Sequence, residues 1–217
     1  MVDKKIIGLT GTYCAGKNYI AHLLEKRGIP VLDIDKLGYK VIEAEKGQLM
    51  ARFGRDILVR DGHNGDFNEG CIDRKRLGQK VFGKPAELAA LEDIIHPAVN
   101  RETLAWIEAC KEKACVINAA LLHRSSAFEL LDAVIIVKAP LLIRLLRAKK
   151  RDKLPWTVLL KRFYSQRKFA SQYSSGKTDI YRVENSCFRL GRFSGIAESD
   201  KRLENRIGEI LSLRGIT

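Results

Sequence analysis

Two groups of residues near the start of the chain have the types and spacing needed for phosphate chemistry. The first is the stretch 11–18, in which Gly11, Gly16 and Lys17 fit the spacing G-x-x-x-x-G-K. In loops of this kind, called P-loops, backbone N–H groups surround phosphate oxygens and the lysine reaches the β and γ phosphates of a nucleotide. The stretch therefore predicts a phosphate-binding loop. The open alternative is an ordinary tight turn between a strand and a helix.

The last position of the loop departs from the usual pattern. Asn18 stands where a Ser or Thr hydroxyl would bind Mg²⁺. An amide oxygen can still bind the metal ion or one of its waters, so Asn18 remains a candidate metal ligand.

The second group is the pair of carboxylates Asp33 and Asp35, which end a short apolar strand predicted over 31–35. Acids at the carboxyl end of a strand beside a P-loop lie where open α/β sheets place their ligands. Both are therefore candidates for catalysis or metal binding. The structural alternative is that Asp35 is the N-cap of a helix over 36–45, and the two interpretations are compatible.

These residues are positioned by a regular alternation of strands and helices. The apolar residues at 6–9 predict a strand, the helical spacing of 20–27 predicts a helix, and Gly28 is placed to end it. The runs 114–118 and 133–137 are apolar almost throughout, as a parallel strand buried on both faces requires, and 180–185 is a plausible last strand. Further helices are predicted over 73–82, 85–95, 99–113 and around 203–211. His96-Pro97 is predicted to end the helix over 85–95.

This order of βα units predicts an α/β fold with a doubly wound parallel sheet in one domain, 1–217. The glycine-punctuated segment 36–85 loosens the pattern, so we expect it to lie outside the sheet core and to cover a substrate. No apolar stretch approaches a membrane span and no signal peptide is visible, which favours a cytoplasmic protein. The cysteines are odd in number and scattered, so no disulfide framework or zinc site is implied. Cys14, inside the loop, is either a reactive thiol or a small tolerated side chain.

The charge of the chain is strongly positive, at +13, and it is concentrated in one region. Ten basic residues and one acid lie between Arg144 and Lys168, and Arg144, Arg147 and Arg151 recur at helical spacing. Guanidinium groups spaced in this way can converge on one phosphate cluster, although a solvated basic face is the alternative. We find no aromatic RNA-binding signature, so a nucleic-acid partner is disfavoured.

Taken together, these fragments resemble the dephospho-coenzyme A kinases, a family of P-loop kinases. The resemblance covers most of the chain. In the first half of the chain it rests on the loop, the two-aspartate strand 31–35, Ile72-Asp73-Arg74, and Leu91-Glu92 with Ile95-His96-Pro97. In the second half it rests on Leu121-Leu122, Arg147, Arg151-Asp152, the stretch 162–166 and Asn185. Departures are Asn18 in the loop and Asn118, Ala120 and Arg124, where the family commonly has an acid, a proline and a glutamate.

The resemblance implies an enzyme that uses ATP and Mg²⁺ to phosphorylate the ribose 3′-hydroxyl of dephospho-coenzyme A, the last step of coenzyme A biosynthesis. It implies Asp35 as catalytic base, Asp33 and Asn18 at the metal, Lys17 and Arg147 on the transferring phosphoryl, and Arg74 and His96 at the acceptor. The ATP site would comprise Gly11, Thr12, Tyr13, Cys14, Ala15, Gly16, Lys17, Asn18, Tyr19, Arg151 and Asn185. Within the domain, 36–85 would bind the acceptor and 144–175 would form a basic lid.

Two other functions stay open at this point. One is a P-loop kinase for another nucleotide or small alcohol, and the other is an ATP-binding protein that has lost catalysis, which the altered loop favours. His96 is equally well explained as a hydrogen-bonded residue at a helix end. The oligomeric state is not predicted by the sequence.

Overall fold

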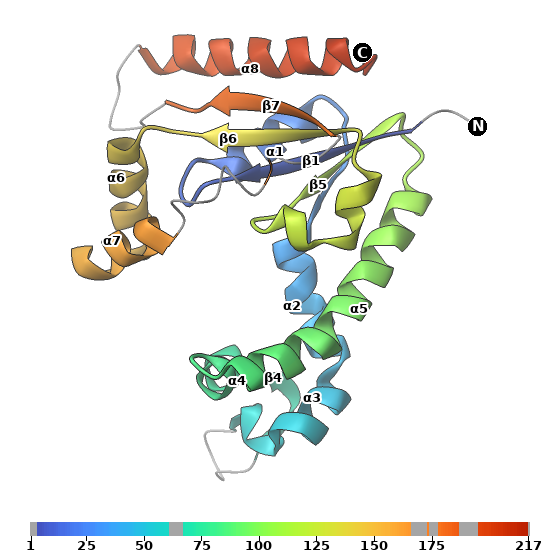
Figure 1. The fold of residues 1–217 in the computed structure, drawn as a ribbon, viewed down its shortest axis with the longest axis vertical. Coiled ribbons are helices and arrows are strands. Elements are labelled where there is room, and N and C mark those ends of the chain that lie inside the picture. Colours follow the sequence, from blue (N-terminus) through green and yellow to red (C-terminus); the bar gives the residue numbers. More distant parts are fainter. Residues whose placement is uncertain (1–3, 61–66, 166–172, 174–177, 187–194, 217) are drawn as a thin grey trace. The chain divides into compact units, whose positions relative to one another are not determined.

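The computed structural model describes residues 4–60, 67–165, 173, 178–186 and 195–216. Its contacts divide the chain into two compact units (Figure 1). The sheet unit comprises residues 1–33 and 107–217, and the helical unit comprises residues 34–106. In chain order the helical unit is thus an insertion into the sheet unit. The expectation of a single domain with an acceptor-binding segment at 36–85 stays a prediction.

The sheet unit is built on five parallel strands. Their order is β2-β5-β1-β6-β7. The strands are β1 (Lys5–Gly11), β2 (Val31–Asp33), β5 (Ala114–Asn118), β6 (Ala133–Lys138) and β7 (Asp179–Glu184). All residues of β5 and the first five of β6 are buried, which explains why these stretches are apolar throughout. The predicted parallel α/β sheet is therefore confirmed.

The two faces of the sheet are covered differently. On one face, alternate residues of β1 such as Ile7 and Leu9 pack with α1 (Lys17–Lys26) and α8 (Gly195–Leu213), and α8 runs alongside the edge strand β7 in Figure 1. On the other face, a Cβ at Gly8 would lie 2.5 Å from Leu122 and 2.7 Å from Leu131. Gly8 therefore lets the short helices η2 (Leu122–Arg124) and η3 (Ser126–Leu130) and the residue after them close over the centre of the sheet.

Two helices follow β6 and contain the start of the predicted basic lid. They are α6 (Leu141–Asp152) and α7 (Trp156–Ser165), and both share a small apolar cluster of Ala148, Leu159 and Phe163. The remainder of the predicted lid, apart from Tyr173, lies outside the described residues.

The helical unit has a core of its own. Its elements are α2 (Ile34–Ala44), α3 (Lys46–Phe53), η1 (Arg55–Ile57), β3 (Leu58–Arg60), β4 (Phe67–Ile72), α4 (Arg74–Val81) and most of α5 (Pro85–Ala109). Seven buried side chains fill this core: Leu49, Phe53, Ile57, Leu58, Ile72, Leu77 and Val81. The antiparallel pairing of β3 with β4 was not predicted, because both strands are short and lie among glycines and charges.

Two predicted boundaries are wrong. Residues 85–95 and 99–113 form one helix, α5, that continues through Pro97 to Ala109. Pro97 is exposed, and Leu91 and Ile94 of the same helix pack against the core of the helical unit, so packing outweighs the hydrogen bond that the proline cannot make. The second error concerns the strand predicted over 31–35. β2 ends at Asp33 and α2 begins at Ile34, so Asp35 lies in the first helical turn and is not the N-cap.

Other predicted boundaries differ by a few residues only. The first helix begins at Lys17 and not at Ile20, and Gly28, with φ of +78°, follows its end as predicted. The helix predicted over 73–82 is α4, and the Asp73 carboxylate accepts hydrogen bonds from the N–H groups of Lys75 and Arg76. Asp73 is thus an N-cap of the usual kind.

Candidate functional site

The register of the sheet brings polar residues together at the carboxyl ends of its strands. Asn118, the last residue of β5, pairs with Leu9 of β1 on one side and with Asp33 of β2 on the other. β1 leads into the loop 11–18, and Asn185 follows β7 with its N–H bonded to the Lys138 carbonyl. Residues from four strands, far apart in sequence, therefore share the edge at which an α/β sheet binds its ligands.

The loop between β1 and α1 has the backbone of a phosphate cradle. Gly16 has a φ of +94° and precedes the first residue of α1, Lys17. A Cβ at this position would also lie 2.2 Å from Nδ2 of Asn185, so both conformation and space require glycine. The N-cap residue is Gly16, so no side chain caps the start of α1. The positive end of the helix dipole attracts an anion to this position.

Arg147 and Asn185 hold the carbonyl groups of this loop from outside. Nη1 of Arg147 donates to the carbonyls of Cys14 and Ala15 at 3.3 and 3.0 Å, and Nδ2 of Asn185 donates to the Ala15 carbonyl at 3.0 Å. Nη2 of Arg147 also donates to both oxygens of Asn185, each at 3.1 Å. Because the C=O and N–H of one trans peptide point in opposite directions, the N–H of Gly16 is turned away from these two residues. Arg147 and Asn185 thus keep the loop open for an anion.

The aromatic ring of Tyr13 fastens the loop to α6 and α7. It meets the ring of Phe163 edge-on with centroids 5.3 Å apart, and the Arg151 guanidinium lies 5.1 Å from its centroid. Its hydroxyl bonds to the Asp152 carboxylate, and its carbonyl accepts from Nε of Arg144 at 2.8 Å. The side chain of Tyr13 is therefore engaged by the lid helices, whereas its backbone remains part of the predicted ATP loop.

The thiol of Cys14 lies among four arginines but is held in its neutral form. The backbone of Cys14 has a φ of +59°, an unusual conformation for a residue other than glycine. Burial raises the pKa of the Cys14 thiol, and the opposing effects of Arg151, Arg144, Arg147 and Arg162 do not cancel that rise. A reactive thiolate in the loop, one of the two alternatives for Cys14, is therefore disfavoured.

Asn118 connects the two candidate metal ligands of the sheet unit. Its Nδ2 donates to Oδ1 of Asn18 at 3.4 Å and to Oδ2 of Asp33 at 3.5 Å. Asn118 is 1% exposed, and among the described residues its Oδ1 has no hydrogen-bond partner. The hydroxyl of Thr12, inside the loop, is likewise buried without a partner in this part of the chain. Buried polar atoms of this kind need a donor or acceptor, which bound phosphate, metal or water supplies.

The remaining predicted residues belong to the helical unit. Asp35 is exposed in the first turn of α2, and His96 is exposed in the middle of α5 and not at a helix end. Arg74 begins α4, and its guanidinium lies 4.4 Å from the ring centroid of Tyr39. The unit thus brings together a cation and an exposed aromatic ring, a pair that the sequence did not predict.

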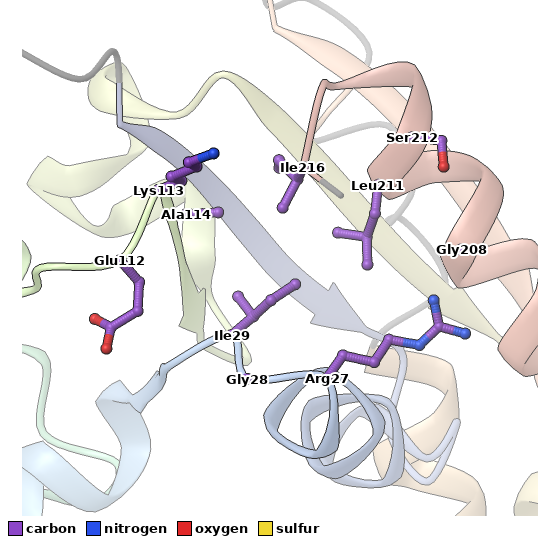
Figure 2. A pocket seen from close by; sticks show the side chains of 10 residues that line it. All are labelled: Arg27, Gly28, Ile29, Glu112, Lys113, Ala114, Gly208, Leu211, Ser212 and Ile216. Carbon is purple, nitrogen blue, oxygen red and sulfur yellow. The ribbon is translucent and has the colours of Figure 1, made fainter.

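A hollow of about 430 Å³ in the sheet unit lies away from these residues (Figure 2). Ala114 in its wall pairs with Lys5 at the start of β1 and β5, whereas the loop and Asn118 lie at the ends of the same strands. Leu211 and Gly208 of α8 line the opposite side. We assign this hollow no part in phosphate binding, because it opens at the amino ends of the strands.

Three contacts of the candidate site were not predicted from the sequence. They are the hydrogen bond from Arg144 to the loop, the contact of Tyr13 with Asp152, and the link from Asn118 to Asn18 and Asp33. Only Asn118 had a usable signal, since it ends a buried strand that neighbours the P-loop strand. Side chains of α6 reach the loop by tertiary packing, which no local pattern shows.

The chain is similar to known kinases along most of its length. The family model described as dephospho-CoA kinase matches residues 5–183. The chain belongs to the dephospho-CoA kinase family. The dephospho-CoA kinase of Treponema pallidum is 30% identical over 97% of this chain and 96% of its own length. That of Anaeromyxobacter dehalogenans is 36% identical over 69% and 70%, respectively.

Solved structures share the fold. A crystal structure of a Thermus thermophilus protein superposes with a TM-score of 0.73 at 27% identity, covering 95% of this chain and 97% of that one. The dephospho-CoA kinase of Campylobacter jejuni, at 23% identity and a TM-score of 0.62 over 95% and 97%, supports the fold alone. The chain is thus a kinase, a phosphotransferase for which ATP is the expected donor and a small molecule the acceptor. Among the described residues no helix is long and apolar enough to cross a membrane.

Proposed function

We propose that the protein transfers the γ-phosphoryl group of ATP to the ribose 3′-hydroxyl of dephospho-CoA. The observation that supports this most strongly is the P-loop held open by Arg147 and Asn185, next to Asp33 and Asn118 at the carboxyl edge of the sheet. Family membership supplies the acceptor. Phosphoryl transfer needs little covalent chemistry from the protein, which must position both substrates and neutralise charge.

The loop 11–18 would bind the phosphates of ATP through its backbone. Gly16 and the first turn of α1 supply N–H groups, the buried Thr12 hydroxyl supplies a further donor, and Lys17 reaches the β and γ phosphates. Tyr19 follows within the same first turn. Arg151 pairs with Asp152 at 2.7 Å, and on closure we expect it to turn toward the phosphoryl group.

Asn18 and Asp33 would hold Mg²⁺, directly or through its waters. The donor set fits this ion, because carboxylate and amide oxygens are hard ligands and the Oδ1 of the adjacent Asn118 still lacks a partner among the described residues. When bound, Mg²⁺ neutralises charge on the β and γ phosphates. Asn18 and Asp33 then have the task of orienting ATP for the acceptor.

The helical unit would bind and activate the acceptor. Asp35 is an exposed carboxylate in the first turn of α2 and would accept the proton of the 3′-hydroxyl as it attacks. Arg74, beside the exposed ring of Tyr39, offers a cation for phosphate and an aromatic surface for the base of the acceptor, and His96 would line the same pocket. A cytoplasmic reaction with no nucleic-acid or membrane partner remains our expectation.

The proposal is tested by incubating the protein with ATP, Mg²⁺ and dephospho-CoA and detecting CoA by mass spectrometry. We expect product from the parent, and Asp35→Asn should keep ATP binding while transfer falls by about 10²- to 10⁴-fold, since only the proton acceptor is lost. Asp56→Asn is the matched control, because this carboxylate is exposed in the same unit and pairs with Lys80.

Two outcomes would contradict the proposal. No product from the parent at saturating substrates and metal would favour an ATP-binding protein without catalysis. Faster transfer to a nucleoside or another alcohol in a substrate panel would favour a different P-loop kinase.

A further inference from the structure

Asn118 has a pattern of contacts that its place in the core does not require. It is buried at the end of β5, where an apolar side chain would satisfy packing, yet its amide lies between Asn18 and Asp33. The Asp33 carboxylate favours this orientation of the amide, because in the reverse orientation two acceptor oxygens would meet without a proton between them.

The two hydrogen bonds use the amide NH₂ group fully. One N–H serves Asn18, on the first turn of α1, and the other serves Asp33, at the end of β2. The other end of the amide, Oδ1, is buried and unpartnered among the described residues. A buried acceptor in this state is costly, and a water polarised by a divalent cation is a strong donor for it.

The charge of the group also matters for metal binding. Of these three side chains only Asp33 has a carboxyl group, so no second carboxylate opposes it in the absence of a metal ion. A second carboxylate at position 118 would lie about 3.5 Å from Oδ2 of Asp33 and would repel it unless a cation lay between them. The pair of asparagines therefore lowers the affinity for a metal on its own and leaves the phosphates of ATP to bring it in.

We infer that Asn118 is a positioning residue that sets Asn18 and Asp33 as one unit for the metal ion of the ATP complex and accepts a hydrogen bond from a metal-bound water. The inference rests on the proposed use of metal and ATP at this edge of the sheet. It makes Asn18 and Asn118 interdependent, so that substituting Asn18 alone is not a simple gain or loss of one ligand.

Mn²⁺ binding measured by electron paramagnetic resonance, with and without ADP, tests the inference without any acceptor. Asn118→Ala should weaken Mn²⁺ binding in the presence of ADP by roughly 10- to 100-fold, the usual cost of losing a residue that orients metal ligands. Asn18→Ala should weaken it similarly, and the double variant Asn18→Ala/Asn118→Ala should lose less than the sum. Cys115→Ala, in the same buried strand, is the control for lost packing and should leave Mn²⁺ affinity unchanged.

Asn118→Asp tests the charge argument. Without nucleotide it should bind Mn²⁺ roughly tenfold more tightly than the parent, because the site gains a carboxylate. Without metal the two neighbouring carboxylates should repel each other and lower the Tm relative to the parent, and Mn²⁺ should restore it.

Three results would overturn the inference. They are additive losses in the double variant, an Asn118→Ala protein with a lower Tm but unchanged Mn²⁺ affinity, and an Asn118→Asp protein with the metal affinity of the parent. Asn118→Ser provides a milder substitution if the alanine variant does not fold. If Mn²⁺ and ADP bind as expected but no CoA forms, the proposed function fails while this inference stands.

Discussion

The P-loop corner of the sheet unit, which we define as the loop 11–18 with Asp33, Asn118, Arg147 and Asn185, differs from the helical unit in its polar contacts. In the corner, side chains reach across more than a hundred residues of sequence to bond with loop carbonyls, as Arg147 does with Cys14 and Ala15. In the helical unit the polar contacts span shorter stretches of sequence, from Arg76 with Asp73 in the same turn to Arg101 with Glu45. The corner is specified by single residues and the helical unit by its apolar pattern.

The polar groups of the two regions contribute differently to stability, because those of the helical unit are exposed and those of the corner are buried. The ion pairs of the helical unit, such as Lys80 with Asp56, lie at the surface and contribute little to stability, so its core of seven apolar side chains must hold it together. The corner instead contains buried polar groups whose partners cannot be replaced by water. One substitution in the corner should therefore change chemistry, and one in the helical core should change stability.

The largest effect should come from Leu49→Ala in the helical core. Leu49 is fully buried, so the cavity and the lost burial should cost about 2–5 kcal/mol of unfolding free energy. Leu24→Ala in α1, equally buried in the core of the sheet unit, is the matched control. Hydrogen exchange by mass spectrometry should show protection lost mainly in 34–106 for the first and in the sheet unit for the second. Equal losses in both units for both variants would mean that they unfold together.

Lys17→Ala should have an effect with a smaller upper limit, and this effect should fall on the reaction and not on stability. Removing one cation from a site where charge develops typically costs about 10²- to 10³-fold in turnover, or roughly 2.7–4 kcal/mol. Lys26→Ala, at the last turn of the same helix, is the control for lost charge on α1. Steady-state kinetics with ATP and dephospho-CoA provide the measurement, and near-parental turnover would refute the P-loop assignment.

Arg147→Ala and Arg151→Ala should have different effects, because Arg147 bonds to the loop carbonyls and Arg151 is expected to act on the phosphoryl group. Arg147→Ala removes donors to three carbonyls and an amide oxygen, so ATP affinity and turnover should both fall, by about 10- to 100-fold. Arg147→Lys should not rescue this, since an ammonium cannot make the forked contacts. Arg151→Ala should lower turnover with ATP affinity nearly unchanged. ATP titration calorimetry and steady-state kinetics measure the two quantities, and parental affinity and turnover in both variants would mean that neither arginine acts on ATP.

The smallest expected effect concerns Cys14. Because burial raises the pKa of its thiol, alkylation by iodoacetamide at pH 8 should be roughly tenfold slower at Cys14 than at the exposed Cys71. Deprotonation is disfavoured in the folded state, so the thiol's contribution to stability is present below the unfolded-state pKa and is lost as the pH rises above it. Peptide mass spectrometry over time measures both rates, and faster modification of Cys14 would indicate a reactive thiolate.

The sequence by itself determined the parallel sheet, the position of the P-loop and the family. These rest on local patterns: strands that are apolar throughout, the spacing of Gly11, Gly16 and Lys17, and motifs in a defined order. The residues proposed for the site at 11–19, 33, 35, 74, 96, 147, 151 and 185 also came from local spacing and resemblance, and their roles stay predictions.

Tertiary structure decided the features that depend on distant partners. The helix through Pro97 persists because its exposed side tolerates the missing hydrogen bond while its other side is packed, and a local rule sees only the proline. Likewise, the register of β5 with β1 and β2 places Asn118 between Asn18 and Asp33. Strand pairing and side-chain packing act between residues that are remote in the chain, so no pattern within one segment contains them.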